Sequence, residues 1–190
     1  MKARAFVGVA AGIALLLVLT AAVLFLRDDE EPREADMEGL LTYSDLSSTH
    51  VEEAVDYEQS PAVGGEHLGD WLDCGVFDEP VPDELAVHDL EHGAVWIAYD
   101  AEALDDAGVA ALAEALPDNG IMSPYLGLDR PVVVSSWERQ VRLDSTDDPR
   151  LPEFVEAYEN NPIAPESGLV TCSGGVDAAG AARVAEQIGR

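Results

Sequence analysis

The longest uncharged segment of the chain places the strongest constraint on its topology. Residues 6–26 read FVGVAAGIALLLVLTAAVLFL and contain no Asp, Glu, Lys or Arg. As a helix rising about 1.5 Å per residue, this run spans roughly 31 Å, close to the thickness of a bilayer core. A cleaved signal peptide is the alternative, but its apolar region is usually about 7–15 residues long and ends at a small-x-small site. This run ends LFLRDDE, and we therefore expect an uncleaved N-terminal transmembrane helix.

The charges beside this segment predict its orientation. Lys2 and Arg4 precede it, whereas Arg27 is followed at once by the acidic run DDEE. Because basic residues accumulate on the cytoplasmic side, we expect a cytoplasmic N-terminus and residues 27–190 outside. We therefore predict a protein of the cell membrane. It crosses the cytoplasmic membrane once, through residues 6–26.

The net charge limits the partners of the exposed part. Lys and Arg number 10 against 38 Asp and Glu, which gives a formal charge of −28. So acidic a surface repels nucleic acid phosphates and anionic lipid headgroups, and we expect no nucleic acid partner. The composition indicates no particular protein partner.

Changes in composition divide the 190 residues into four parts. A cytoplasmic stub and transmembrane anchor occupy residues 1–28. An acidic linker, extended by its own charge, follows over 29–49. The extracytoplasmic domain takes residues 50–172, and an Ala-rich tail helix takes 173–190.

Hydrophobic patterning predicts the elements of the domain. The run AVWIAYD at 94–100 is typical of a buried strand, and Asp100 is placed to cap a helix over 101–116. Residues 131–144 indicate a second strand, and a short helix is expected at about 150–161. Together they predict a small α+β domain with a few-stranded sheet and two to three helices.

The two cysteines, Cys74 and Cys172, fall in the part expected outside the cytoplasm. An even pair in an oxidising compartment indicates one disulfide, which would stabilise the fold by about 2–4 kcal/mol. Two alternatives remain open at this point: Cys74 as a metal thiolate, or two free thiols.

All four histidines lie within residues 50–92. His88 and His92 occur in VHDLEHGAVWIAYD, and their spacing of four places them on one face of either a helix or a strand. Glu91 lies beside them only on a helix. In H-x-x-E-H peptidases two such histidines bind zinc and the glutamate is the general base. Here Gly93 and a strand-like run follow at once, so the helix would end at the second ligand, which weighs against a peptidase.

Clustered imidazoles favour Zn or Cu over Ca or Mg. The sequence therefore predicts a metal site in which Glu91 or Asp89 orients an imidazole. Met122 could add a soft ligand, although a methionine in the core is the commoner case. The candidate ligands are His67, His88 and His92, with His50 a weaker one.

These motifs resemble a known bacterial family. HVEEAVDYEQSPAVGGEH, WLDCGVFDEPVPDE, VHDLEHGAVWIAYD, SPYLGLDRPVVVSSW and FVEAYENNPIAPE occur in the order seen in the family called domain of unknown function 3105. The resemblance runs from about His50 to Cys172, and it implies an N-terminal membrane anchor. One loop departs from the family pattern: Ser60 replaces a proline and Gly64 a serine, which implies a more mobile loop before His67. The motif positions that the resemblance assigns are His67, Cys74, His88, Glu91, His92 and Gly93.

Three functional hypotheses follow. The first is a non-catalytic metal-binding or ligand-binding domain with no catalytic residue. The second is a zinc-dependent hydrolase in which Glu91 activates a metal-bound water. The third is a structural or interaction module whose histidines only form internal hydrogen bonds.

Overall fold

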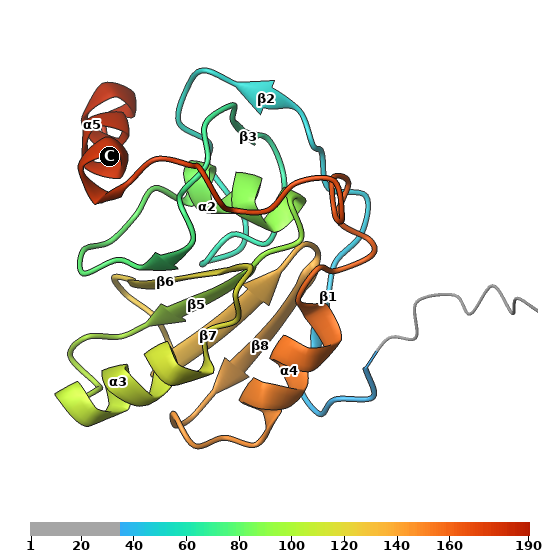
Figure 1. The fold of residues 1–190 in the computed structure, drawn as a ribbon, viewed down its shortest axis with the longest axis vertical. Helices are drawn as coiled ribbons and strands as arrows, with labels where there is room; N and C mark the ends of the chain where they lie inside the picture. The colour runs from blue at the N-terminus through green and yellow to red at the C-terminus, as the bar shows by residue number, and fades with distance from the viewer. Residues whose placement is uncertain (1–34) are drawn as a thin grey trace, which may run out of the picture. The chain divides into compact units, whose positions relative to one another are not determined.

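A six-stranded sheet forms the centre of the fold in the computed structural model, which describes residues 35–190 (Figure 1). Its strand order is β1-β8-β7-β5-β6-β4, and a separate two-stranded parallel ladder joins β2 to β3. The strands are β1 (Leu41–Thr42), β2 (His50–Val51), β3 (His67–Leu68), β4 (Gly75–Val76), β5 (Val95–Tyr99), β6 (Gly120–Pro124), β7 (Val132–Ser136) and β8 (Arg139–Leu143).

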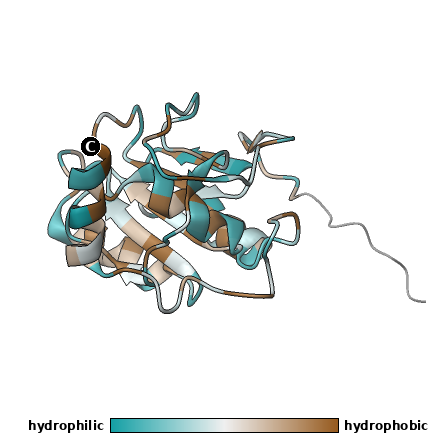
Figure 2. Cartoon of the chain, turned by 90° about the horizontal axis from the view of Figure 1, so that it is seen from above, coloured by the Kyte–Doolittle hydropathy of each residue, from teal (hydrophilic) through white to brown (hydrophobic). Residues whose placement is uncertain are grey.

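The central strand β5 divides the apolar residues between two cores. All five of its residues are buried, and it pairs parallel to β6 and antiparallel to β7. Because side chains alternate along a strand, Val95, Ile97 and Tyr99 enter one core, whereas Trp96 and Ala98 enter the other. Pale and brown residues accordingly run along the strands at the centre of the domain in Figure 2.

Helices cover both faces of the sheet (Figure 1). On one face, α3 and α4 contribute Leu112, Leu151 and Phe154 to the first core. On the other face lie α2, the β2–β3 ladder and α5. The described residues thus form a mixed α+β domain with four helices, where two to three were predicted. They are α2 (Asp83–Glu91), α3 (Asp106–Ala115), α4 (Arg150–Tyr158) and α5 (Ala178–Ile188).

Two local predictions are corrected by the structure. The stretch 131–144 is not one strand but the hairpin β7–β8, because the chain turns at Trp137 and Glu138, the latter with a left-handed φ of 59°. The helix after β5 starts later than predicted. Its cap is Asp105, which accepts a hydrogen bond from the Gly108 amide at 2.9 Å, while Asp100 accepts from the Glu102 amide in the preceding turn.

The described part of the acidic segment packs on the domain. Residues 35–49, which composition assigns to a linker, add β1 to the sheet by pairing Leu41 with Gln140 of β8. Met37 is buried in the same core as Val95. This edge strand therefore belongs to the folded unit.

The C-terminal segment is joined to the domain by the predicted disulfide. Cys74 and Cys172 are bonded, with their Cα atoms 5.0 Å apart, which excludes both free thiols and a metal thiolate at Cys74. Asp177 caps the following helix, α5, by accepting from the Gly180 amide at 2.8 Å.

The predicted transmembrane helix at 6–26 lies outside the described residues. Within residues 35–190, no helix is both long and apolar enough to cross a membrane.

Candidate metal centre

The β2–β3 ladder brings two distant histidines together. His50 pairs with His67 in the parallel register, and residues opposite each other in such a pair project from the same face. Their ring centroids are 4.9 Å apart. A two-residue ladder between segments 17 positions apart thus provides half of the site.

Helix α2 provides the other half. His88 and Glu91 are one turn apart and lie on the same side of the helix, facing the ladder. One carboxylate oxygen, Oε2 of Glu91, lies 3.1 Å from Nε2 of His67, 3.5 Å from Nε2 of His50 and 3.9 Å from Nε2 of His88. Three imidazoles therefore converge on one oxygen.

The spacing of these four side chains fits a transition metal ion. Zinc binds imidazole nitrogen and carboxylate oxygen at about 2.0–2.2 Å, so two ligand atoms in a tetrahedral site lie about 3.4 Å apart. The three N–O distances fall on either side of that value, and the potential ligand atoms of His50, His67, His88 and Glu91 all lie within 4.8 Å of one another. Small side-chain rotations would complete the coordination.

The hydrogen bonds of His67 determine which of its nitrogens can bind a cation. Nδ1 lies 2.8 Å from the Gly65 carbonyl oxygen, which can only accept, so Nδ1 carries a proton. In the neutral ring, Nε2 then directs a lone pair at the Glu91 carboxylate 3.1 Å away. That contact is favourable only if a positive charge, either a second proton or a metal ion, lies between the two atoms.

His88 presents the same arrangement with less ambiguity. Its Nδ1 donates to the Leu68 carbonyl at 2.9 Å, which leaves Nε2 facing Glu91. Burial, together with the neighbouring His92 and His67, lowers the pKa of His88 to about 4. His88 is therefore a neutral base at neutral pH, as a metal ligand must be.

Aromatic side chains shield the centre from water. Trp71 lies 5.5 Å from the His88 ring, and Trp137 meets the His67 ring edge-on at 6.3 Å. The side chains of His67, His88 and Glu91 are at most 5% exposed, whereas that of His50 is 50% exposed. The cluster is thus buried except for His50, which reaches the surface.

His92, predicted as a ligand, is not among the four residues that converge. It follows the last turn of α2, where its Nδ1 donates to the Thr171 carbonyl at 3.2 Å and its Nε2 lies 3.6 Å from Oε2 of Glu166. Its ring packs against His88, with centroids 4.6 Å apart. These contacts connect the end of α2 to the 166–171 loop.

Two other residues considered from the sequence have different surroundings. Asp89 does not orient an imidazole. Its Oδ2 accepts from the Leu72 amide at 3.0 Å, and burial raises its pKa well above the usual range. Met122 is a core residue of β6. Backbone carbonyls, rather than carboxylates, orient the imidazoles of His67 and His88.

Glu91 lies in a different place from the one that the sequence suggested. It was considered as a base or as an orienting group, yet its oxygen lies where a ligand would. The i,i+3 spacing from His88 would have indicated this had the segment been identified as helical.

Comparison with known proteins gives the family. A family model described as "Protein of unknown function (DUF3105)" matches residues 50–174. The chain belongs to this family. All four converging side chains and both cysteines lie within the DUF3105 match. Neither a curated protein nor a solved structure matches the chain.

Proposed function

We propose that this DUF3105 domain is a non-catalytic metal-binding module that holds one Zn²⁺ or Cu²⁺ ion. The ligands are His50, His67, His88 and Glu91. The observation that carries the proposal is that three Nε2 atoms face one carboxylate oxygen while two of the rings already use Nδ1 to donate to a carbonyl. A divalent cation between these atoms would accept the lone pairs that otherwise repel one another, and so form a bond to each nitrogen and to the carboxylate oxygen.

The donor set favours Zn²⁺ and Cu²⁺ over other ions. Imidazole nitrogens dominate it, whereas Ca²⁺ and Mg²⁺ prefer oxygen ligands. No sulfur atom belongs to the cluster within the described residues, which disfavours Cu⁺.

The same geometry favours binding over hydrolysis. A catalytic zinc ion usually has three protein ligands and an open position for water. Here Glu91 would be a fourth ligand, so it is not available as the general base that the hydrolase hypothesis requires.

We further propose that the domain lies outside the cytoplasmic membrane, anchored by residues 6–26. The disulfide supports this location, because such bonds persist in oxidising compartments. Extraction of membranes with alkaline carbonate should leave the full-length protein in the pellet. Protease added to intact cells should degrade the domain, and resistance to it would contradict the proposed side.

Elemental analysis tests metal binding. The full-length protein, purified in detergent without affinity histidines, should carry close to one equivalent of zinc or copper. A His67→Ala, His88→Ala double variant should lose it, and His92→Ala should retain it. Absence of metal from the wild type after loading and buffer exchange would overturn the proposal and favour a purely structural module. Equal loss in His92→Ala would overturn the ligand set.

A further inference from the structure

His50 differs from the other members of the metal centre in how it is held. His67 and His88 are buried, and each has its Nδ1 fixed by a backbone carbonyl. The His50 side chain is half exposed, and its Nδ1 has no hydrogen-bond partner among residues 35–190. An imidazole whose Nδ1 has no hydrogen-bond partner is held less firmly on a metal ion than one fixed by a carbonyl, because only its packing against the rings of His67 and His88 orients it.

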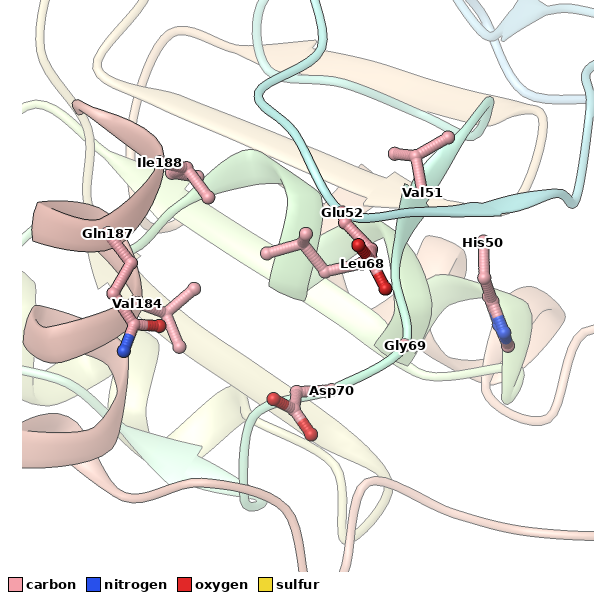
Figure 3. Close-up of a pocket in the computed structure, with 9 residues that line it drawn as sticks. All are labelled: His50, Val51, Glu52, Leu68, Gly69, Asp70, Val184, Gln187 and Ile188. Atoms are coloured by element: carbon pink, nitrogen blue, oxygen red, sulfur yellow. The ribbon is translucent and has the colours of Figure 1, made fainter.

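A pocket opens directly beside His50 (Figure 3). Its volume is about 420 Å³, and it lies between the β2–β3 ladder and α5. Gly69 contributes no side chain there, and even a Cβ at that position would lie 4.0 Å from Nδ1 of His50. The half-exposed ligand is therefore next to a space large enough for a small molecule or a side chain.

The lining of this pocket selects the chemistry of an occupant. Glu52 and Asp70 place carboxylates between His50 and α5, and no Lys or Arg of residues 35–190 lines the pocket. Leu68, Val184 and Ile188 add apolar surface. Such a lining repels anions and accepts a neutral or cationic group with an apolar body.

We propose that His50 is the exchangeable ligand of the centre and that this pocket admits an external imidazole, which takes the place of His50 on the metal ion. This inference rests on the metal binding proposed above. The exchange breaks the bond from the metal to Nε2 of His50 and forms one to the incoming nitrogen. No electron is transferred, and a neutral imidazole brings no proton to be removed. His67, His88 and Glu91 continue to hold the ion.

Chemical rescue in full-length protein tests the proposal. His50→Gly, which extends the pocket to the metal position, should weaken Cu²⁺ binding roughly tenfold or more. Millimolar imidazole should restore the affinity and the wild-type electron paramagnetic resonance spectrum. Acetate at the same concentration should not. His67→Gly, whose site is fully buried and away from the pocket, should not be rescued by imidazole.

A plug variant links the rescue to this pocket. Gly69 has no left-handed φ, so a larger residue can be placed there without backbone strain. In a His50→Gly, Gly69→Leu double variant the leucine should fill the approach and abolish rescue. Gly69→Leu alone should retain one equivalent of copper. Rescue that persists in the double variant would overturn the pocket as the route.

The outcomes separate this inference from the function on which it rests. If the wild type binds no metal, both proposals are overturned. If the wild type binds copper and folded His50→Gly, checked by circular dichroism, is not rescued, only the exchangeable ligand is overturned. An end-blocked Gly-His-Gly peptide is the second probe. Stronger rescue by the peptide assigns the incoming imidazole to a histidine of a partner chain, and equal or weaker rescue assigns it to a free small molecule.

Discussion

At the scale of single residues, the carbonyl oxygens of Gly65 and Leu68 determine what the cluster can bind. Each accepts a hydrogen bond from Nδ1 of a buried imidazole and so directs the other ring nitrogen toward Glu91. Glu91 then supplies the only negative charge among the four converging side chains. Its charge, more than its shape, should therefore set the affinity for a divalent ion.

The variant Glu91→Gln tests this argument because it preserves the shape and removes the charge. We expect the dissociation constant for Zn²⁺ to rise by roughly 10–100-fold or more, measured by competition with a chromophoric chelator. Glu166→Gln is the matched control, since Glu166 lies beside His92 and not in the cluster. An unchanged affinity in Glu91→Gln would mean that the carboxylate is not a ligand.

Asp83 should make stability depend on pH in the absence of metal. Burial raises its pKa from 3.8 to about 6, although the Ala62 amide and the Tyr125 hydroxyl donate to it. Because the folded-state pKa is the higher one, the folded protein binds the extra proton. The resulting stability is complete below pH 3.8 and is lost as pH rises through 6. The two-unit difference corresponds to about 3 kcal/mol.

The measurement compares wild type with Asp83→Asn in urea, with a chelator present. The free energy of unfolding of the wild type should fall by about 2 kcal/mol relative to the variant between pH 4 and pH 7, because pH 4 lies just above the unfolded-state pKa and not all of the roughly 3 kcal/mol is present there. Between pH 7 and pH 9 the difference should stay constant. A difference that is independent of pH over the whole range would show that Asp83 titrates normally in the folded state.

At the scale of elements, the loop before β3 determines where His67 lies. Gly64 has a φ of +145°, and a Cβ there would lie 2.9 Å from Cδ1 of Leu46. The glycine that departs from the family pattern therefore occupies a position that other residues rarely adopt. A side chain there would meet Leu46, and the carbonyl of the neighbouring Gly65 orients His67.

Gly64→Ala should thus affect both stability and metal binding. We expect a loss of about 2–3 kcal/mol in the free energy of unfolding, from the strained backbone and the contact with Leu46, together with a weaker affinity for Zn²⁺. Gly127→Ala is the control. Its φ of +78° is also left-handed, but no atom lies within 4 Å of the added Cβ. The control should lose about 1 kcal/mol and bind Zn²⁺ normally. Equal effects on affinity would mean that the loop does not position His67.

The elements also show what the sequence could and could not predict. Strand β5 and helices α4 and α5 were predictable, because an apolar run, a proline in the first turn and an Asp cap act locally. Helix α2 was not predictable. It is buried on nearly all sides, so its sequence lacks the alternation of apolar and polar faces that marks a surface helix. The hairpin turn at Trp137 and Glu138 contains none of the usual Asn or Gly residues.

The candidate site, too, was predictable where the signal is local and unpredictable where it depends on long-range contacts. Clustering of the histidines predicted a metal site, and the cysteine count predicted the disulfide. The membership of His50 depends on its register with His67 in the ladder, which is a long-range pairing that no local pattern specifies. The exclusion of His92 depends on contacts with Thr171 and Glu166, far along the chain.

At the scale of the whole molecule, contacts at its two ends fasten α5 to the rest of the domain. Before the helix, two backbone hydrogen bonds reinforce the disulfide: the Asp73 amide donates to the Val176 carbonyl at 2.9 Å, and the Val176 amide donates to the Trp71 carbonyl at 2.8 Å. After the helix, Arg190 donates to the buried carboxylate of Glu84 at 2.7 Å. This helix also forms one wall of the pocket beside His50.

Removal of the disulfide should therefore destabilise the fold as a whole. The bond closes a loop between cysteines separated by 98 positions. In the chain-entropy account, closing a loop of that length raises the free energy of the unfolded state by nearly 5 kcal/mol. Removal of a native disulfide typically lowers the free energy of unfolding by about 2–5 kcal/mol. We expect the Cys74→Ser, Cys172→Ser double variant to lose about 2–5 kcal/mol in the free energy of unfolding, measured by urea denaturation.

A reductant provides the internal control for this prediction. It should lower the stability of the wild type to that of the double serine variant and leave the variant unchanged. The two proteins should then unfold at the same urea concentration, because they differ only by sulfur and oxygen atoms that no longer form a bond. If the reductant left the wild type unaffected while the bond was shown to be broken, the fold would owe its stability to the cores and the Arg190–Glu84 contact. The 98-residue closure would then contribute nothing measurable.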